Sequence, residues 1–257
     1  STKLADLGAR LGGGADSDRA GVSLRTLSDP QTRQAAFAIL RDVLAAPRFD
    51  KDIFERERAR AVAALRESLT RPETVVSRAF WSALYGEHPY GRLPTEDSLG
   101  RIGSEDLQRF HAAHYRASAA VVTIVGALKR NEAEALARML TESLPAGEPP
   151  APLPAPALPG AGEVRVAHPA AQAHVQLGLP ALRRDDPDFH ALMVGNYTLG
   201  GGGFVSRLMK EVRDKRGFAY SVYSYFAPMR EAGPFQIGLQ TRREQAGEAL
   251  QVVREVL

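Results

Sequence analysis

Arg213 and Tyr220 are the two side chains whose types and spacing could serve one reaction. Arg213 lies near the end of a charged amphipathic segment, Gly217 interrupts that segment, and Tyr220 opens a run of alternating aromatic residues. A helix, a turn and a strand in that order can bring a guanidinium and a phenol to the same side. Both groups donate hydrogen bonds suited to a carbonyl oxygen or a developing oxyanion. The simpler alternative is an arginine in a surface ion pair and a tyrosine in a core.

Four consecutive glycines, Gly200, Gly201, Gly202 and Gly203, come just before that charged segment. A nucleotide-binding loop is a poor interpretation, because no Gly-Lys-Ser/Thr follows and the preceding segment, 189–199, is itself helical in pattern. Two interpretations remain. The glycines form a mobile connection between two helices, or they allow the backbone to approach an extended ligand closely.

Other catalytic groups have weaker support. The chain has no cysteine, which excludes disulfides, thiolate metal sites and cysteine nucleophiles. His111 and His114 lie three apart on one expected helix, but neither HExxH nor HxxEH occurs, and histidines at a surface or boundary are the simpler interpretation. Ser206 lacks the Gly-x-Ser-x-Gly elbow of a serine nucleophile. The sequence therefore predicts neither a metal site nor a serine nucleophile.

The elements that must position these residues follow an α+β pattern. Helices are expected over 30–46, 49–69, from 72 to about 85, 104–115, 131–144, 186–199 and after Thr241, and the first residues, up to Gly14, are interpreted as the end of another helix. Strands are expected over 20–27, 119–128, 163–168, 173–180, 219–228 and 233–241. The β-branched run over 119–128 is the strongest candidate for a buried strand.

Composition limits the possible classes of protein. The chain has 257 residues, of which 44% are hydrophobic and 25% charged, and its net charge of +3 does not demand a nucleic-acid partner. No apolar run is long enough to span a membrane. Seven of the 18 residues over 145–162 are proline, which predicts an extended linker between a first domain at 1–145 and a second at 163–257, with the linker at 146–162. Both ends are in helical period, so we expect a fragment of a longer protein, periplasmic if a signal peptide was removed.

The stretch LGGGGFVSRLMKEVRDKRGFAYSVYSYF resembles the second-domain signature of the insulinase/pitrilysin-type zinc metallopeptidases, a family that includes mitochondrial processing peptidase. Other stretches resemble family segments in family order: LGARLGGGADSDRAGVSLRTL, FERERARAVAALRESLTRPE, LYGEHPYGR, DLQRFHAAHYRASAAVVTIVGAL and GPFQIGLQT. The resemblance implies an α+β fold with two similar domains of mostly antiparallel sheet, helices packed on one face of each, and a fragment of a longer two-domain subunit.

The same resemblance implies roles for particular residues. Family members hold zinc through an HxxEH helix and a distant glutamate, and an arginine and a tyrosine seven apart face the metal. Arg213 and Tyr220 match that pair. Ala64 occupies the glutamate position, seven residues after Glu57, and a methyl group cannot ligate zinc. We therefore expect no zinc or other cofactor on this chain, with the glycine run and Phe204 contacting peptide substrate.

Two functions are compatible with these expectations. The first is a zinc-free subunit, inactive alone, that forms a heterodimer with an HxxEH-bearing zinc peptidase and supplies Arg213 and Tyr220 to metalloendopeptidase activity in that complex. The second is a peptide-binding or scaffold protein with a peptidase fold and no part in hydrolysis. Because both Arg213 and Tyr220 are present, the sequence favours the first.

Overall fold

The computed structural model describes residues 2–148 and 151–257. It divides into two compact units, the first made of Ser1–Val62 and Asp97–Pro152 and the second of Ala63–Glu96 and Leu153–Leu257. The second unit thus takes residues from both sides of the proline-rich segment, in which residues 149–150 lie outside the described part. The contiguous domains at 1–145 and 163–257 stay a prediction.

The first unit begins with helix α1 (Thr2–Asp6) and an antiparallel hairpin of β1 (Arg10–Ala15) and β2 (Ala20–Arg25). The expected strand over 20–27 is therefore confirmed. The helical interpretation of the first residues holds only for α1, because residues 12–14 pair with β2 instead. Three glycines in a row have no side chains with which to form a pattern, so the sequence alone did not reveal β1.

Helix α2 (Pro30–Ala45) begins where its cap residues predict. Asp29 Oδ2 accepts a hydrogen bond from the backbone N–H of Thr32 at 2.9 Å, and proline takes the first helical position. The buried face of α2 packs on α7 (Arg130–Thr141), with a core of Phe37, Leu40, Leu136, Met139 and Leu140. The other helices that lie wholly or partly in this unit are α3 (Lys51–Ser68), α5 (Glu96–Arg101) and α6 (Ser104–His114), with the short turn η2 (Ala117–Ala119).

The β-branched run over 119–128 does not form a strand, so that prediction is wrong for this structure. Ile124 packs into the core between α2 and α7, whereas the side chains of Val121 and Val125 are 91% and 93% exposed. The segment 163–168 was also expected to be a strand and is not; its Val164 and Val166 are exposed. Alternation predicts an extended backbone, but a strand also needs a hydrogen-bonded neighbour, and neither segment has one among the described residues.

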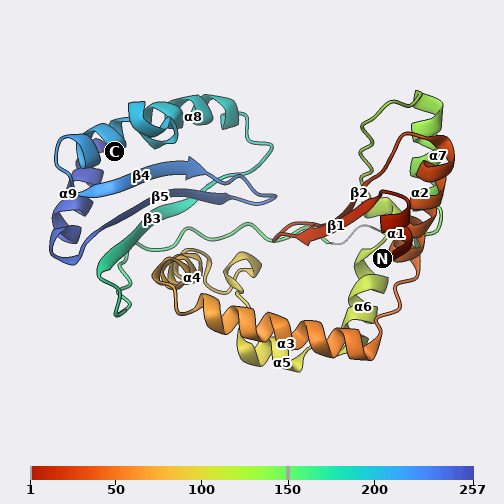
Figure 1. The fold of residues 1–257 in the computed structure, drawn as a ribbon. Coiled ribbons are helices and arrows are strands. Elements are labelled where there is room, and N and C mark those ends of the chain that lie inside the picture. Colours follow the sequence, from red (N-terminus) through yellow and green to blue (C-terminus); the bar gives the residue numbers. More distant parts are fainter. Residues whose placement is uncertain (1, 149–150) are drawn as a thin grey trace. The chain divides into compact units, whose positions relative to one another are not determined.

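The second unit is built on a three-stranded antiparallel sheet. Strands β3 (Gln172–Leu182), β4 (Ala219–Phe226) and β5 (Gly233–Arg242) lie in the order β3-β5-β4, with β5 in the centre (Figure 1). Helix α9 (Ala246–Val256) and the helical turn η5 (Met209–Asp214) cover one face of the sheet, and a short turn, η6 (Arg243–Gln245), leads into α9. The core between them includes several side chains that are at most 3% exposed, among them Leu208, Val212, Val222, Ile237, Leu239 and Val253. Burial of each contributes about 1.5–3 kcal/mol.

Helix α4 (Pro72–Tyr85) belongs to this second unit although it precedes the proline-rich segment. It packs against β3, where Phe80 contacts Gly178. The hydroxyl of Tyr85 donates to the carbonyl of Ala232 at 3.0 Å, and burial raises the pKa of the Tyr85 phenol. These contacts between 80–85 and 178–232 explain why residues 63–96 cluster with the second sheet.

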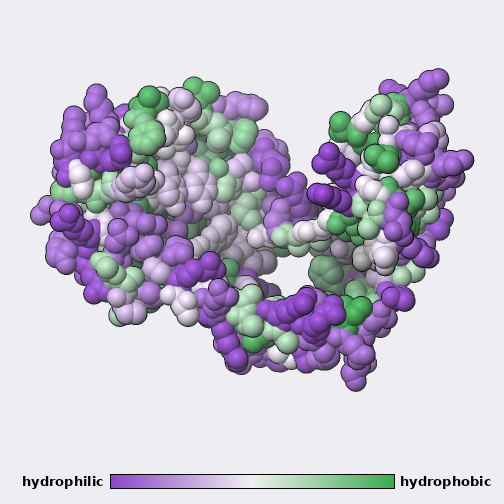
Figure 2. All heavy atoms as spheres, in the orientation of Figure 1, coloured by the Kyte–Doolittle hydropathy of each residue, from purple (hydrophilic) through white to green (hydrophobic). Residues whose placement is uncertain are grey.

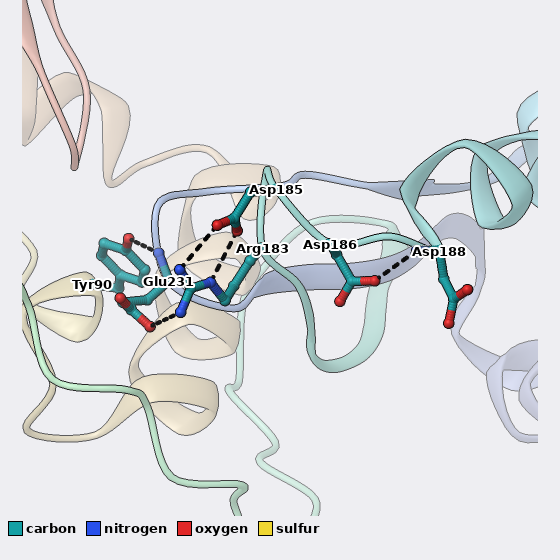
Figure 3. A network of polar contacts seen from close by, with 6 residues as sticks. All are labelled: Tyr90, Arg183, Asp185, Asp186, Asp188 and Glu231. Carbon is teal, nitrogen blue, oxygen red and sulfur yellow. Dashed lines mark hydrogen bonds and ion pairs between the residues drawn. The ribbon is translucent and has the colours of Figure 1, made fainter.

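A network of polar contacts joins the segment after α4 to the second sheet (Figure 3). In η1 (Pro89–Gly91), the buried Tyr90 accepts a hydrogen bond at its hydroxyl from the backbone N–H of Glu231, at 3.0 Å. The Glu231 carboxylate lies 3.7 Å from the Arg183 guanidinium, which also binds Asp185. The turn after β4 is therefore held to both η1 and the end of β3.

Helix α8 (Phe189–Asn196) lies on the sheet side covered by α9 but contributes little to the core. Asn196, at its C-terminal end, is its only buried residue. Figure 2 shows hydrophobic side chains gathered on the surface over this helix, where Leu192, Met193 and Val194 are exposed. The attachment of α8 to the sheet therefore depends on its C-terminal end.

Candidate functional site

The guanidinium of Arg213 lies over two aromatic rings. Its central carbon is 4.9 Å from the centre of the Phe204 ring and 5.6 Å from that of Tyr220, within the range of cation–π attraction. The two rings are 68% and 85% exposed, and the Arg213 side chain is 32% exposed. The structure thus brings together three residues singled out in the sequence, in an arrangement we call the Phe204–Arg213–Tyr220 stack.

The stack leaves hydrogen-bond donors for a ligand. Among the described residues, Arg213 makes one side-chain hydrogen bond, from Nη1 to Asp214 Oδ1 at 2.9 Å. Ion pairs this exposed contribute little to stability, so Asp214 can give way to a stronger acceptor. The guanidinium has five N–H donors in its plane. The arrangement can therefore hold a carboxylate or a carbonyl oxygen at the edge of Arg213.

A π-helical turn directs Arg213 outward. Arg213 lies in η5, where Lys215 N–H bonds to the carbonyl of Lys210, five residues earlier, at 3.1 Å. Such wide turns are rare and are often found at functional sites. In this turn Val212 is fully buried while Arg213 faces the two rings. Gly217 then ends the helix with a φ of +63°, a left-handed conformation that glycine adopts without strain.

A β-bulge directs Tyr220. On β4, Ala219 lies opposite Thr241 and Val222 lies opposite Leu239, so three steps along β4 correspond to two along β5. Because of the extra residue, Tyr220 and Ser221 are both exposed, and Val222 faces the core as Ala219 does. Bulges often re-aim a side chain next to a functional site. The alternation of aromatic residues in the sequence gave no sign of this bulge.

The glycine run is packed against the sheet at its first residue, Gly200, whereas Gly201 and Gly203 are exposed, and its mobility stays a prediction. It forms part of two short helical turns, η3 (Tyr197–Gly201) and η4 (Gly203–Val205). A Cβ at the buried Gly200 would lie 2.6 Å from the backbone nitrogen of Ser224 and would also meet its hydroxyl oxygen. Glycine is needed at position 200 because the turn approaches β4 too closely there for a side chain. Contact of the run with peptide stays a prediction.

Sequence analysis missed a buried polar pair behind the glycine run. The amide nitrogen of Asn196 donates to the carbonyl of Ser224 at 3.0 Å, and the Ser224 hydroxyl donates to Asn196 Oδ1 at 2.6 Å. Asn196 is 6% exposed and Ser224 2%. An asparagine within the apolar stretch ALMVGNYTL was the available signal. The pair joins the end of α8 to β4 and so supports the turn that carries Phe204.

The residues that were considered for a metal site make other contacts. His111 is hydrogen-bonded through Nε2 to the carbonyl of Leu44 at 2.7 Å, at the end of α2. Ala64 is exposed on α3, and hydrogen bonds from Arg56 and Arg60 lower the pKa of Glu57 on the same helix. Within residues 2–148 and 151–257, no group of three or more His, Asp or Glu side chains is arranged to hold a metal ion. The absence of zinc from this chain stays a prediction.

Comparisons with known proteins agree on the family to which this chain belongs. Residues 101–257 match the family described as the peptidase M16 inactive domain. An uncharacterized zinc protease of Streptomyces coelicolor is 31% identical over 231 residues, covering 86% of this chain and 50% of its own length. One from Mycobacterium tuberculosis is 32% identical over 232 residues, covering 86% and 52%. The chain thus spans about half the length of the curated relatives it matches.

Solved structures agree with this result. A crystal structure of a peptidase M16 inactive domain from Pseudomonas fluorescens superimposes with a TM-score of 0.95 at 38% identity, over 99% of this chain and 62% of that one. A protease from Helicobacter pylori, at 21% identity, shares the fold with a TM-score of 0.83 over 99% of this chain and 62% of its own. In the part of this chain that the structure describes, no helix has the length and apolar character to cross a membrane.

Proposed function

Because this chain belongs to the peptidase M16 inactive-domain family, we propose that it is a zinc-free peptidase subunit. In this proposal it binds peptide substrate and supplies Arg213 and Tyr220 to the active site of a partner that bears HxxEH and the zinc ion. The observation that carries the proposal is the Phe204–Arg213–Tyr220 stack, in which an arginine and a tyrosine seven positions apart meet at an exposed surface.

The chemistry of the stack supports a role in hydrolysis. A guanidinium and a phenol can both donate hydrogen bonds to a peptide carbonyl oxygen as it gains negative charge. Donors held in advance at that position stabilise the transition state more than the bound substrate, and so raise turnover. Phe204 contributes because its ring lies beneath the Arg213 guanidinium and helps to orient it before substrate arrives.

The described residues of this chain do not fit a zinc ion of their own. Ala64 stands at the position where the family resemblance places a glutamate ligand, and the neighbouring Glu57 carboxylate already binds Arg56 and Arg60. No other cluster of metal-binding side chains occurs among the described residues. These features support a zinc ion on the partner and a binding and stabilising role for this chain.

Strand β4 supports the binding of an extended peptide beside the stack. It lies at one edge of the sheet, and among the described residues it has a neighbouring strand, β5, on one side only. A strand edge without a second neighbouring strand offers backbone hydrogen bonds to a peptide that adds to the sheet, here away from Ser224, whose carbonyl already accepts from Asn196. We place the peptide along this edge, close to Phe204 and the exposed Gly201 and Gly203.

The test is reconstitution with an HxxEH-bearing subunit of the same family. This chain alone should not cleave an internally quenched peptide, whereas the mixture should, in a zinc-dependent manner. Arg213→Ala and Tyr220→Phe should each lower turnover in the mixture, and Tyr223→Phe, on the same strand, should not. If both site variants retain full activity in a working complex, the stack takes no part in hydrolysis and the scaffold function is favoured instead.

A further inference from the structure

The hydroxyl of Thr241 makes a partly buried hydrogen bond close to the stack. Thr241 lies near the end of the central strand β5 and is 2% exposed. Its Oγ1 donates to the backbone carbonyl of Phe218 at 2.6 Å. Phe218 immediately precedes β4, so this bond fixes the main chain at the point where the strand that carries Tyr220 begins.

The backbone of Phe218 is also tied to the helix that carries Arg213. Its N–H donates to the carbonyl of Val212 at 3.0 Å, and the N–H of Gly217 donates to the carbonyl of Arg213 at 2.8 Å. Phe218 therefore connects η5 through its N–H with β5 through its carbonyl. The Thr241 hydroxyl supplies the second of these two connections.

The position of Tyr220 depends on this backbone more than on packing. Its ring is 85% exposed, so the core does not hold it in place. It lies within the bulge, after the last pair in register, Ala219 with Thr241, and before the next, Val222 with Leu239. The direction in which Tyr220 points is thus determined by where the bulge begins, at residues 218 and 219.

We infer that Thr241 is a positioning residue whose hydroxyl fixes the start of the β4 bulge and thereby holds the Tyr220 ring against Arg213. Thr241 does not contact the stack itself; it acts through the backbone of Phe218. Its importance for peptide hydrolysis rests on the proposed function, but its effect on the stack does not.

The test is the NMR signal of the Arg213 Nε–Hε group in the uniformly labelled chain. The ring current of an aromatic ring beneath a guanidinium shifts the Nε–Hε signal upfield. The signal that disappears in Arg213→Lys is the one that belongs to Arg213. Tyr220→Ala defines the change expected when one ring is lost. The informative pair is Thr241→Ser and Thr241→Ala, because both lack the same methyl group and differ only in the hydroxyl.

We expect the Arg213 Nε–Hε signal of Thr241→Ser to keep the wild-type upfield shift. In Thr241→Ala the upfield shift should decrease by as much as it does in Tyr220→Ala. Thr141→Ala is the matched control, since the Thr141 hydroxyl also bonds a backbone carbonyl, that of Ala137 at 3.0 Å, but in α7. It should leave the Arg213 signal unchanged. A wild-type shift in Thr241→Ala would overturn the inference, as would loss of the shift in a folded Thr241→Ser.

Activity in the reconstituted complex separates this inference from the proposed function. If Tyr220→Phe has no effect on turnover while Thr241→Ala still loses the upfield shift, the positioning role stands and the catalytic role fails. If both roles hold, Thr241→Ala should lower kcat more than it raises KM, and Thr241→Ser should restore most of the kcat.

Discussion

Substitution of Gly200 by alanine tests whether the glycine run is there for close packing. The new methyl group would lie 2.6 Å from the Ser224 backbone nitrogen and 2.8 Å from Leu208 Cδ1, with the Ser224 hydroxyl oxygen closer still. Ser224 and Leu208 are 2% and 0% exposed, so neither can move aside easily. Overpacking of this kind costs about 1–3 kcal/mol. Reduced flexibility of the unfolded chain offsets about 0.4–1 kcal/mol of that cost.

We therefore expect Gly200→Ala to lower the free energy of unfolding by about 1–2 kcal/mol, which corresponds to a fall of about 3–6 °C in Tm for a chain of this size. Gly195→Ala is the matched control. Gly195 lies in α8, five residues earlier, and an added methyl group there would meet nothing within 4 Å. The control should be more stable than wild type by about 0.5–1 kcal/mol, as is usual for alanine in place of glycine within a helix.

Urea and thermal unfolding followed by circular dichroism would measure both variants. The reasoning is refuted if Gly200→Ala is as stable as Gly195→Ala, because the turn would then have room for a side chain and the glycines would need another explanation. Gly201→Ala extends the test. Its methyl group would lie 2.7 Å from the Asn196 side-chain nitrogen, which is itself held by Ser224, so this variant should also be destabilised.

Three further predictions follow from single groups. Tyr220→Phe should lower turnover in the reconstituted complex by about 10²–10³-fold if its hydroxyl stabilises the oxyanion, and equal kcat values for Tyr220→Phe and Tyr223→Phe would contradict that role. Burial raises the pKa of Tyr85 above its ordinary value of 10.0, so this phenol ionises first in the unfolded chain, and stability should fall as pH rises above 10 toward the folded-state pKa. Tyr85→Phe should flatten that alkaline loss in unfolding experiments; an unchanged slope would show that other groups cause it. Hydrogen bonds from Thr32 lower the pKa of Asp29 below its ordinary value of 3.8, so the stability from this helix cap should be present above that value and lost as pH falls through the folded-state pKa. Asp29→Ala should destabilise the protein at pH 7 but have little further effect at pH 2, and the same deficit at both pH values would argue against the cap.

Local signals were enough to predict several elements from the sequence. Asp29-Pro30 predicted the start of α2, Pro72 that of α4, and the glycine after Tyr85 its end. These signals work because a helix cap and a helix-breaking glycine act on backbone groups within a few residues of themselves. The spacing of Arg213 and Tyr220, read with the family resemblance, likewise singled out two members of the stack.

What only the tertiary structure decided depends on contacts between distant residues. The run over 119–128 has strand composition, yet whether it forms a strand depends on a neighbour that no local pattern supplies. The close approach of β4 to Gly200 could not be predicted, because nothing within the glycine run shows which strand lies against it. Tyr220 reaches Arg213 through a bulge defined by pairing with Leu239 and Thr241 on another strand. Local sequence determines which backbone conformations are favourable, whereas long-range packing and strand pairing decide which of them is adopted. The candidate site depends on these long-range contacts.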